Sequence, residues 1–337
     1  MSDLNELVNL KAAEWSHQLT LLKPLRFINK IAVYCLCPFS NFILLHFIVF
    51  RSPLVVRRSY RSILITCTLV DITSTLTNIW CLMYGRYIGT RTIYFLEGAV
   101  SILPLSLQWI SFSLMFGVRL SESTILVVEF YFRHYIIKHR RTPSHVVLFG
   151  MIGLAIAVAL GLSVTIMFDC CILNPMQSGN FEALKAIHSG PILFDDTNHK
   201  IAYFTMWYRR SITIGGVVIP VFISFLSVRL MSNQTVTLSK KTKLMLNNFS
   251  ATLYMKTIIP ALTTVLPLTS KFFFNLFGLD TWSLNEMTTT FYVWLPFINS
   301  ISTLLIISCY RRLLFQAIRK AFGQRSTSIY SISRLTT

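Results

Sequence analysis

Seven apolar runs alternate with short polar or basic segments along the chain. Each run is close to or longer than the about 20 residues that a helix, rising about 1.5 Å per residue, needs to cross a bilayer core of about 30 Å. The strands of a membrane barrel would instead alternate apolar and polar residues over about ten positions. The pattern therefore predicts an all-α bundle of seven membrane-spanning helices, at about residues 31–50, 62–84, 107–132, 146–168, 211–231, 249–270 and 287–309.

Composition and charge agree with this prediction and indicate an orientation. The chain is 53% hydrophobic and only 13% charged, with a mean hydropathy of +0.59. The segments after the odd-numbered runs, with the C-terminal tail and with Arg229 at the end of the fifth run, carry eighteen basic residues and no acidic one, against eleven basic and ten acidic on the other side. Because Lys and Arg accumulate on the cytoplasmic side, we expect the N-terminus outside and the C-terminus inside. The net charge of +18 then indicates loops held at an anionic inner leaflet, not a nucleic-acid partner.

The segments that flank the runs have their own patterns. Residues 1–30 lack the basic-then-apolar stretch and cleavage site of a signal peptide, so we expect an extracellular N-terminal segment. Over residues 310–322 apolar positions recur at helical spacing opposite basic ones, which predicts an amphipathic helix parallel to the membrane. Residues 323–337 are rich in Ser and Thr, which favours a disordered cytoplasmic tail.

Motifs for enzyme or metal chemistry are absent from the sequence. There is no GxxxxGK[ST] phosphate loop, no HExxH and no paired CxxC motif. We therefore expect no enzymatic activity, no cofactor and no metal site. Two glycosylation sequons, at Asn233 and Asn248, fall on the predicted cytoplasmic side and should carry no glycan.

Charged side chains inside the predicted spans are the main candidates for function. Each costs roughly 2.5–3.5 kcal/mol to insert, so such residues normally face the bundle and pair. Glu129 and Arg133 are four residues apart on one helical face and can pair with each other. Asp71, Glu122 and Lys256 lie near mid-membrane and, together with Arg119, predict a polar cluster, in which they serve either as ion pairs alone or as part of a site. The charges within the spans are Asp71, Arg119, Glu122, Glu129 and Lys256.

Short motifs follow one another in an order that is typical of one receptor family. They are Asn41, Arg51-Ser52-Pro53, Ser59-Tyr60 and Asp71, then Phe130-Tyr131-Phe132-Arg133-His134-Tyr135, and finally Leu295-Pro296-Phe297-Ile298-Asn299 with Tyr310-Arg311-Arg312. Over about residues 30–312 the chain resembles the nematode serpentine chemoreceptors of the Str superfamily, especially the delta class. Two positions depart from rhodopsin-type receptors, since Phe132 stands where these carry an acid and Ser300 where a proline usually follows the asparagine.

The resemblance implies a G-protein-coupled chemosensory receptor of olfactory type, in the plasma membrane of sensory neurons or their cilia. In such a receptor a small-molecule ligand favours a state whose cytoplasmic ends open toward a heterotrimeric G protein. Arg133 would be a switch that exchanges Glu129 for groups of the partner, although an interfacial, snorkelling arginine is the alternative. The other residues implied at the G-protein surface are Lys240, Lys241, Lys243, Tyr310 and Arg311.

The resemblance also implies a ligand pocket in the outer half of the bundle. Aromatic and hydroxyl side chains there suit a small, mostly apolar ligand, whereas Trp and Tyr near span ends also occur simply as interfacial residues. The candidates are Gln108, Trp109, Phe112, Thr263, Thr264, Tyr292 and Trp294. Asn299 joins the predicted polar cluster around Asp71, where an acid belongs to a sodium and water site in many rhodopsin-type receptors.

The sequence also allows one disulfide and leaves two alternative protein classes to consider. Cys81 lies near the outer end of the second span, from where it could pair with Cys170 or Cys171 of the second outer loop. A seven-span ligand-gated cation channel would place the N-terminus inside, against the charge distribution. A transporter would show an internal repeat with broken helices at matching positions, and none is visible.

Overall fold

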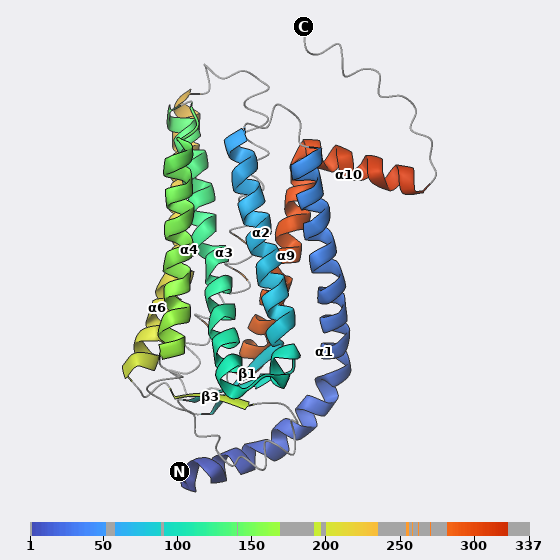
Figure 1. The fold of residues 1–337 in the computed structure, drawn as a ribbon, viewed down its shortest axis with the longest axis vertical. Helices are drawn as coiled ribbons and strands as arrows, with labels where there is room; N and C mark the ends of the chain where they lie inside the picture. Colours follow the sequence, from blue (N-terminus) through green and yellow to red (C-terminus); the bar gives the residue numbers. More distant parts are fainter. Residues whose placement is uncertain are drawn as a thin grey trace.

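The structure, a computed structural model of the 337-residue chain, is a bundle of long helices that run alongside one another (Figure 1). It describes residues 2–51, 58–88, 91–139, 141–168, 192–196, 200–234 and 282–322, with isolated positions between 254 and 270. Apart from those positions, the run predicted at 249–270 and the tail predicted at 323–337 lie outside the described residues.

Five of the described helices are long and apolar enough to cross a membrane. They are α1 (Ser2–Phe50), α2 (Arg58–Cys81), α3 (Leu105–His139), α4 (His145–Phe168) and α6 (Lys200–Gln234). The apolar part of α1 begins at Phe27, so this helix continues well beyond the membrane toward the N-terminus. The long apolar helices are those that the sequence predicts, and they make the protein a helical membrane bundle.

Near the C-terminus the chain turns sharply between α9 (Trp282–Ile306) and α10 (Ser308–Ala321). Ile307 has an extended backbone, and the helical segments on either side of it meet at 94°. Figure 1 shows α10 leaving the bundle sideways. Its exposed Phe315 and Ile318 lie among basic residues such as Arg319, a composition that suits the surface of an anionic bilayer.

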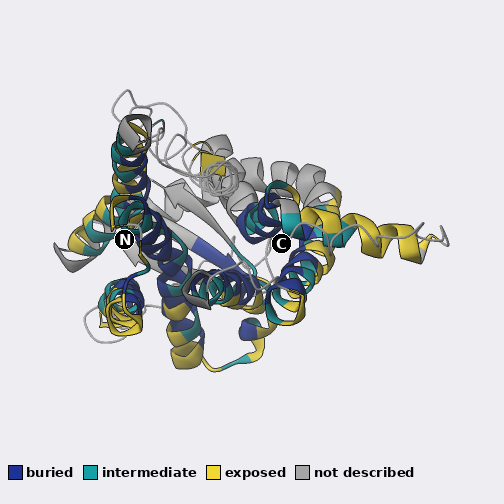
Figure 2. Cartoon of the chain, turned by 90° about the horizontal axis from the view of Figure 1, so that it is seen from above, coloured by how far each residue is buried: buried dark blue, intermediate teal, exposed yellow. Residues whose placement is uncertain are grey.

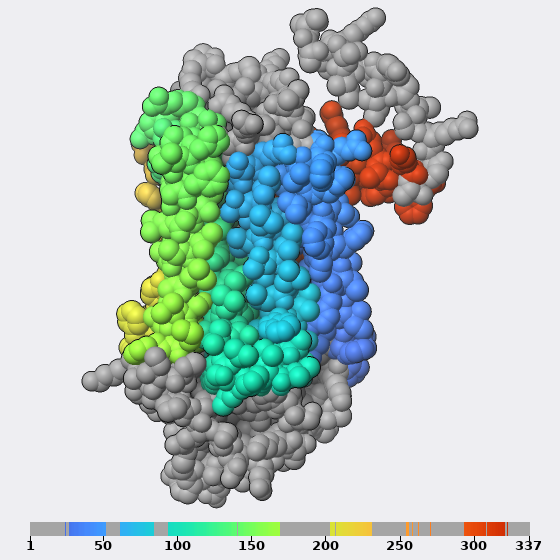
Figure 3. All heavy atoms as spheres, viewed as in Figure 1, coloured from blue at the N-terminus to red at the C-terminus, as the bar shows by residue number. Residues whose placement is uncertain are grey.

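The α3 helix is the central helix of the bundle and packs against α2, α4 and α6. The outer helices bury only their inward faces, as the colours in Figure 2 show. On α4, for example, Phe149 and Leu154 are exposed while Leu148 and Ile152 are buried. Exposed apolar side chains are expected here, because lipid tails are as apolar as they are. In Figure 3, α1, α2 and α4 form one face of the bundle.

A three-stranded antiparallel sheet covers one end of the bundle, and the sequence analysis did not predict it. Its strands are β1 (Met83–Ile88), β2 (Arg91–Leu96) and β3 (Ile192–Asp196), with β2 in the middle. The register pairs Ile88 with Arg91 and Arg91 with Asp196. A short 3₁₀ helix, η1 (Ala99–Ile102), leads from β2 toward α3. We call this end the sheet end, and the opposite end, where α10 leaves, the α10 end.

The turn from α2 into the sheet depends on one close backbone approach. Leu82 ends α2 with a positive φ of 39°, and its amide donates to the Asn78 carbonyl at 2.8 Å. Gly98, after β2, lies against the last turn of α2, where a Cβ atom would be 2.1 Å from the Trp80 carbonyl oxygen. Only glycine fits this position without moving backbone.

Two groups of buried apolar side chains hold the bundle together. The sheet-end core joins α2, β2, α3 and α4 through side chains such as Leu96, Trp109, Phe112, Met115 and Leu162. The α10-end core joins α1, α2, α3, α4, α9 and α10 through side chains such as Ile48, Leu64, Phe132, Leu148 and Tyr310. The polar residues that are candidates for function lie between and beside these cores.

Candidate functional site

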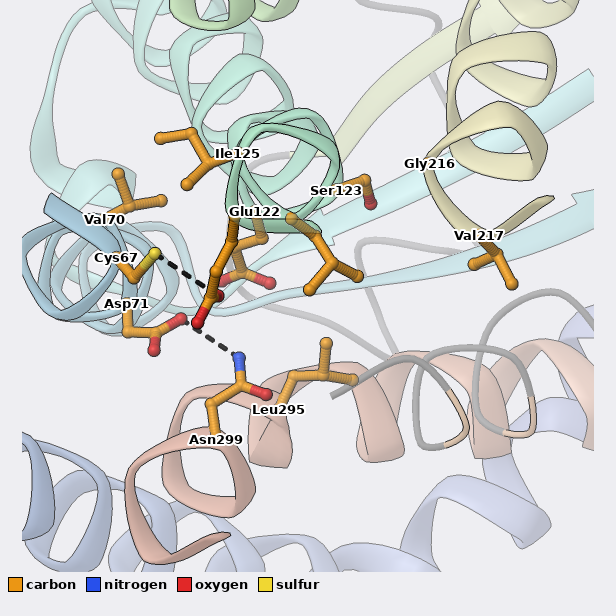
Figure 4. A pocket seen from close by; sticks show the side chains of 12 residues that line it. Cys67, Val70, Asp71, Glu122, Ser123, Ile125, Gly216, Val217, Leu295 and Asn299 are labelled. Atoms are coloured by element: carbon orange, nitrogen blue, oxygen red, sulfur yellow. Dashed lines mark hydrogen bonds between the residues drawn. The ribbon is translucent and has the colours of Figure 1, made fainter. Parts of the chain in front are cut away.

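Four helices converge on a cavity of about 30 Å³ in the middle of the bundle (Figure 4). This volume is enough to admit water, because one water molecule needs about 10–15 Å³. The side chains that define its chemistry are carboxylates from α2 and α3 and an amide from α9. The lining residues are Cys67, Val70, Asp71, Glu122, Ser123, Ile125, Leu126, Glu129, Gly216, Val217, Leu295 and Asn299.

Helical spacing and one glycine bring these groups together. Cys67 and Asp71 are four residues apart on α2, and Glu122 and Glu129 are seven apart on α3, so each pair shares one face of its helix. On α6, a Cβ atom at Gly216 would lie 2.7 Å from the Cβ of Ser123. The absence of a side chain at Gly216 therefore lets α6 approach α3 beside the cavity.

The cavity has a clear pattern of donors and acceptors. Asn299 donates its Nδ2 to Asp71 Oδ1 at 3.2 Å, and the Cys67 thiol donates to Glu129 Oε2 at 3.6 Å. The Asn299 Oδ1 atom and both carboxylate oxygens of Glu122 are buried, and the described part of the chain gives them no hydrogen-bond donor. The Ser74 hydroxyl of α2 lies close enough to interact with Glu122, without the geometry of a normal hydrogen bond. Acceptors are therefore in excess in this cavity.

Arg119, which the sequence analysis grouped with this cluster, points to a different partner. Its Nε donates to Asn78 Oδ1 at 2.8 Å, and its Nη2 donates to the same oxygen. Asn78 lies seven residues after Asp71 on α2, toward the sheet end. Both Arg119 and Asn78 are buried. The guanidinium is thus held between α2 and α3 and does not line the cavity, and Asn78 is a partner that the sequence analysis missed.

At the α10 end, Glu129 and Arg133 are buried on α3, with exposed fractions of 2% and 5%. Phe132 packs in the α10-end core with Tyr310, which is fully buried in the first turn of α10. Arg311, next to Tyr310, is exposed. The predicted switch residue therefore lies inside the bundle in this structure, although at the end of a span a snorkelling arginine would extend toward water.

A polar contact beside Arg133 joins α3 to α6. His134 Nδ1 lies 3.1 Å from Ser227 Oγ, and the Ser227 hydroxyl donates to the Ile223 carbonyl at 2.7 Å. Since the serine proton is already used, Nδ1 of His134 must be the donor. His134 was noted in the sequence only as part of a motif, and nothing in the sequence pairs it with Ser227.

A second set of polar contacts, which we call the polar seam, connects α1 to α9. Asn41 donates its Nδ2 to the carbonyls of Cys37 at 2.9 Å and Pro296 at 3.2 Å, and Ser300 donates to Ser40 at 2.7 Å. Asn41 and Pro296 belong to motifs that the sequence analysis singled out. The seam positions α9, and through it Asn299, against the rest of the bundle.

The described residues of the predicted ligand pocket are engaged in packing at the sheet end. Gln108 donates to the Leu103 carbonyl at 2.7 Å, just before α3 begins. Trp109 and Phe112 are buried in the sheet-end core, with ring centroids 5.4 Å apart. Trp294 donates to Asn29 Oδ1 at 2.7 Å and so ties α9 to α1. Whether a ligand contacts them stays a prediction.

The remaining candidates are Cys81 and residues whose side chains the structure does not describe. Tyr292 lies on α9 without a described side chain. Cys81 donates to the Ser111 carbonyl at 3.6 Å and forms no disulfide with any cysteine that the structure describes. Within the described ranges, no group of three or more His, Cys, Asp or Glu is placed to hold a metal ion. The predicted residues outside the described ranges are Cys170, Cys171, Lys240, Lys241, Lys243, Lys256, Thr263 and Thr264.

The chain was compared with protein families and with curated proteins. The family described as serpentine type 7TM GPCR chemoreceptor Srd matches residues 27–316. The match begins where the apolar part of α1 begins and ends within α10. No curated protein matches the chain.

Proposed function

Since the chain belongs to the serpentine type 7TM GPCR chemoreceptor family Srd, a family of multi-pass membrane receptors and not of enzymes, we propose that it detects a small, odorant-like molecule and activates a heterotrimeric G protein. We place it in the plasma membrane of sensory neurons or their cilia. In this proposal the N-terminus and the sheet end face outside, and the α10 end faces the cytoplasm, in line with the basic loops.

The observation that carries the proposal is the burial of Arg133 with Glu129 at the α10 end of α3. A guanidinium that is buried beside an acid on its own helix cannot bind a partner. It becomes able to form charge-assisted hydrogen bonds to the partner only after the helices separate. We assign this arrangement to a closed, resting state. A ligand that favours separated helix ends would expose Arg133 to the G protein.

The proposed partner surface surrounds Arg133. Tyr310 closes the α10-end core, and the exposed Arg311 follows it. Lys240, Lys241 and Lys243 add positive charge on the same predicted side. The basic residues of α10 would hold that helix against the anionic inner leaflet, at about 1 kcal/mol for each residue near the surface.

The proposed ligand site lies inside the bundle next to the sheet, between the outer halves of the helices. Trp109, Phe112 and Tyr94 form an edge-to-face aromatic group there, and Arg209 of α6 lies over the Phe116 ring at 5.2 Å. Such surroundings favour a small molecule with a large apolar part. Thr263, Thr264, Tyr292 and Trp294 are the further contacts that we propose.

The experiment is a G-protein reporter assay with a panel of volatile and water-soluble small molecules, in cells that display the protein at their surface. Once an agonist is found, Arg133→Ala should lose most of the response at equal surface expression. The matched control is Arg141→Ala, because Arg141 is an exposed arginine just beyond the end of α3. Undiminished signalling by Arg133→Ala would contradict the switch role, and a channel would instead give ligand-driven currents without G protein.

A further inference from the structure

The cavity between α2, α3, α6 and α9 brings three carboxylates together in the middle of a membrane bundle. Asp71, Glu122 and Glu129 all line it, and the described lining residues include no Lys, Arg or His (Figure 4). In a medium of low dielectric constant, two neighbouring carboxylates need either a cation beside them or a proton that neutralises one of them. The cavity therefore needs positive charge from some source.

The hydrogen-bond pattern indicates which acid lacks a partner. Both oxygens of Glu122 are buried, and no donor of the described residues, the nearby Ser74 hydroxyl included, meets them with normal hydrogen-bond geometry. The same holds for Oδ1 of Asn299. Asp71, in contrast, accepts from Asn299 Nδ2. A neutral carboxylic acid at Glu122 would add an O–H donor to a cavity in which acceptors are in excess, and would remove one negative charge at the same time.

The charged and titratable neighbours do not supply an obvious substitute. Glu122 lies within electrostatic range of Asp71 and Arg119, and Arg119 directs its guanidinium to Asn78. The thiols of Cys37 on α1 and Cys67 on α2 are also near, while α6 and α9 contribute Gly216, Val217, Leu295 and Asn299. Among the described residues, no group of three or more His, Cys, Asp or Glu side chains is placed to hold a metal ion. A proton satisfies the same charge balance with no coordination shell.

We propose that this cavity is a proton-binding site, in which Glu122 is a neutral carboxylic acid at neutral pH and shares its proton with Asp71. The pair then carries a single negative charge, which the Asn299 amide stabilises. Water that entered the cavity when α6 or α9 moved would favour release of the proton. Proton binding is therefore coupled to the packing of these helices. The proposal does not depend on the ligand or on the G protein.

Infrared spectroscopy of the purified protein in lipid nanodiscs tests this site directly. We expect wild-type protein at neutral pH to show the carbonyl stretch of a carboxylic acid, shifted in D₂O. Glu122→Gln should lose this band, and Asp71→Asn should change its frequency because the acceptor of the proton changes. The matched control is Glu97→Gln, since Glu97 pairs with Lys30 at the sheet end and should contribute nothing to the band.

Three results would overturn the proposal, and the first needs only wild-type protein. The band could be absent at neutral pH, or it could be unaltered by Asp71→Asn. If the band is absent in wild type and emerges in Lys256→Gln, Lys256 is the counter-ion of an ionised Glu122. Thermal unfolding measured in parallel in sodium chloride and in N-methylglucamine chloride tests whether a sodium ion supplies the positive charge. If sodium stabilises the wild-type protein and this effect disappears in Glu122→Gln, the bound cation is a sodium ion and not a proton.

Discussion

Arg119 and Asn78 illustrate how a neutral side chain helps to accommodate a buried charge. Two N–H groups of the guanidinium converge on one amide oxygen, and both residues are buried between α2 and α3. Hydrogen bonds to charged groups contribute about 1.5–3 kcal/mol each, and loss of the acceptor leaves two N–H groups of the buried charge without this bond. This contact should therefore matter for folding.

We predict that Asn78→Ala lowers the free energy of unfolding by about 1.5–3 kcal/mol, because it removes the acceptor and leaves Arg119 in place. Thermal unfolding in detergent or nanodiscs would measure the change. Thr73→Ala is the control, since Thr73 is exposed on the same helix and donates only to the Leu69 carbonyl within its own helix. Equal stability of Asn78→Ala and Thr73→Ala would show that the Arg119 contact is not stabilising.

Gly98 gives a second prediction at the level of one residue. A methyl group at this position would overlap the Trp80 carbonyl oxygen, and the obstacle is backbone that cannot rotate away. Gly98→Ala should destabilise the protein by about 1–3 kcal/mol, the usual range for overpacking. Gly153→Ala on α4 has open space around it and should be neutral or stabilising by up to about 1 kcal/mol. Comparison of the two unfolding midpoints distinguishes the close approach from a general effect of glycine.

At the scale of elements, the sequence predicts the apolar helices well and their ends poorly. A bilayer core sets the minimum length of an apolar run, but a helix can continue into water at little cost. The predicted runs at 31–50 and 211–231 belong to helices that begin at Ser2 and Lys200. The pattern in these extensions is amphipathic or mixed, so hydropathy alone marks only the membrane part.

The sheet was missed because membrane hydropathy dominated the interpretation of residues 83–96. A signal was present in Arg91–Leu96, which contains the β-branched and aromatic residues Thr92-Ile93-Tyr94-Phe95. Only two residues, Gly89 and Thr90, separate it from Met83–Ile88. That spacing is typical of a hairpin with a two-residue loop. The third strand, Ile192–Asp196, is distant in sequence, and local patterns do not reveal its pairing with β2.

Side-chain direction explains what could be predicted of the site. Asp71 and Asn299 were grouped from their depth and from the resemblance, and they are hydrogen-bonded in the structure. Arg119 was grouped by the same count of charges, but it reaches Asn78, a residue whose polar amide drew no attention in the sequence. Depth along a helix is readable from sequence, whereas the direction of a long side chain depends on which neutral acceptors surround it.

The contact of His134 with Ser227 leads to a prediction about how α3 and α6 are held together. We expect a double-mutant cycle with His134→Ala and Ser227→Ala to give a coupling free energy of about 0.5–1.5 kcal/mol in unfolding, the usual contribution of one hydrogen bond. Additive effects of the two substitutions would mean that the contact does not stabilise the pair of helices. Thr213→Ala serves as a control, because its hydroxyl donates only within α6.

At the scale of the whole molecule, the account depends on which end of the bundle faces the cytoplasm. The sheet end carries the long N-terminal part of α1, and the α10 end carries Arg133, Tyr310 and α10 (Figure 1). A receptor that activates a G protein needs the second group inside the cell. The distribution of eighteen basic and no acidic residues on one side of the predicted spans gives the same orientation.

Epitope tags at both termini, read by antibody in intact and in selectively permeabilised cells, measure this orientation without a ligand. We predict that the N-terminal tag is stained in intact cells and the C-terminal tag only after permeabilisation. That result would place Arg133 and α10 where a G protein can bind them. A C-terminal tag that is stained in intact cells, with the N-terminal tag protected, would contradict the receptor function and direct attention to ion currents.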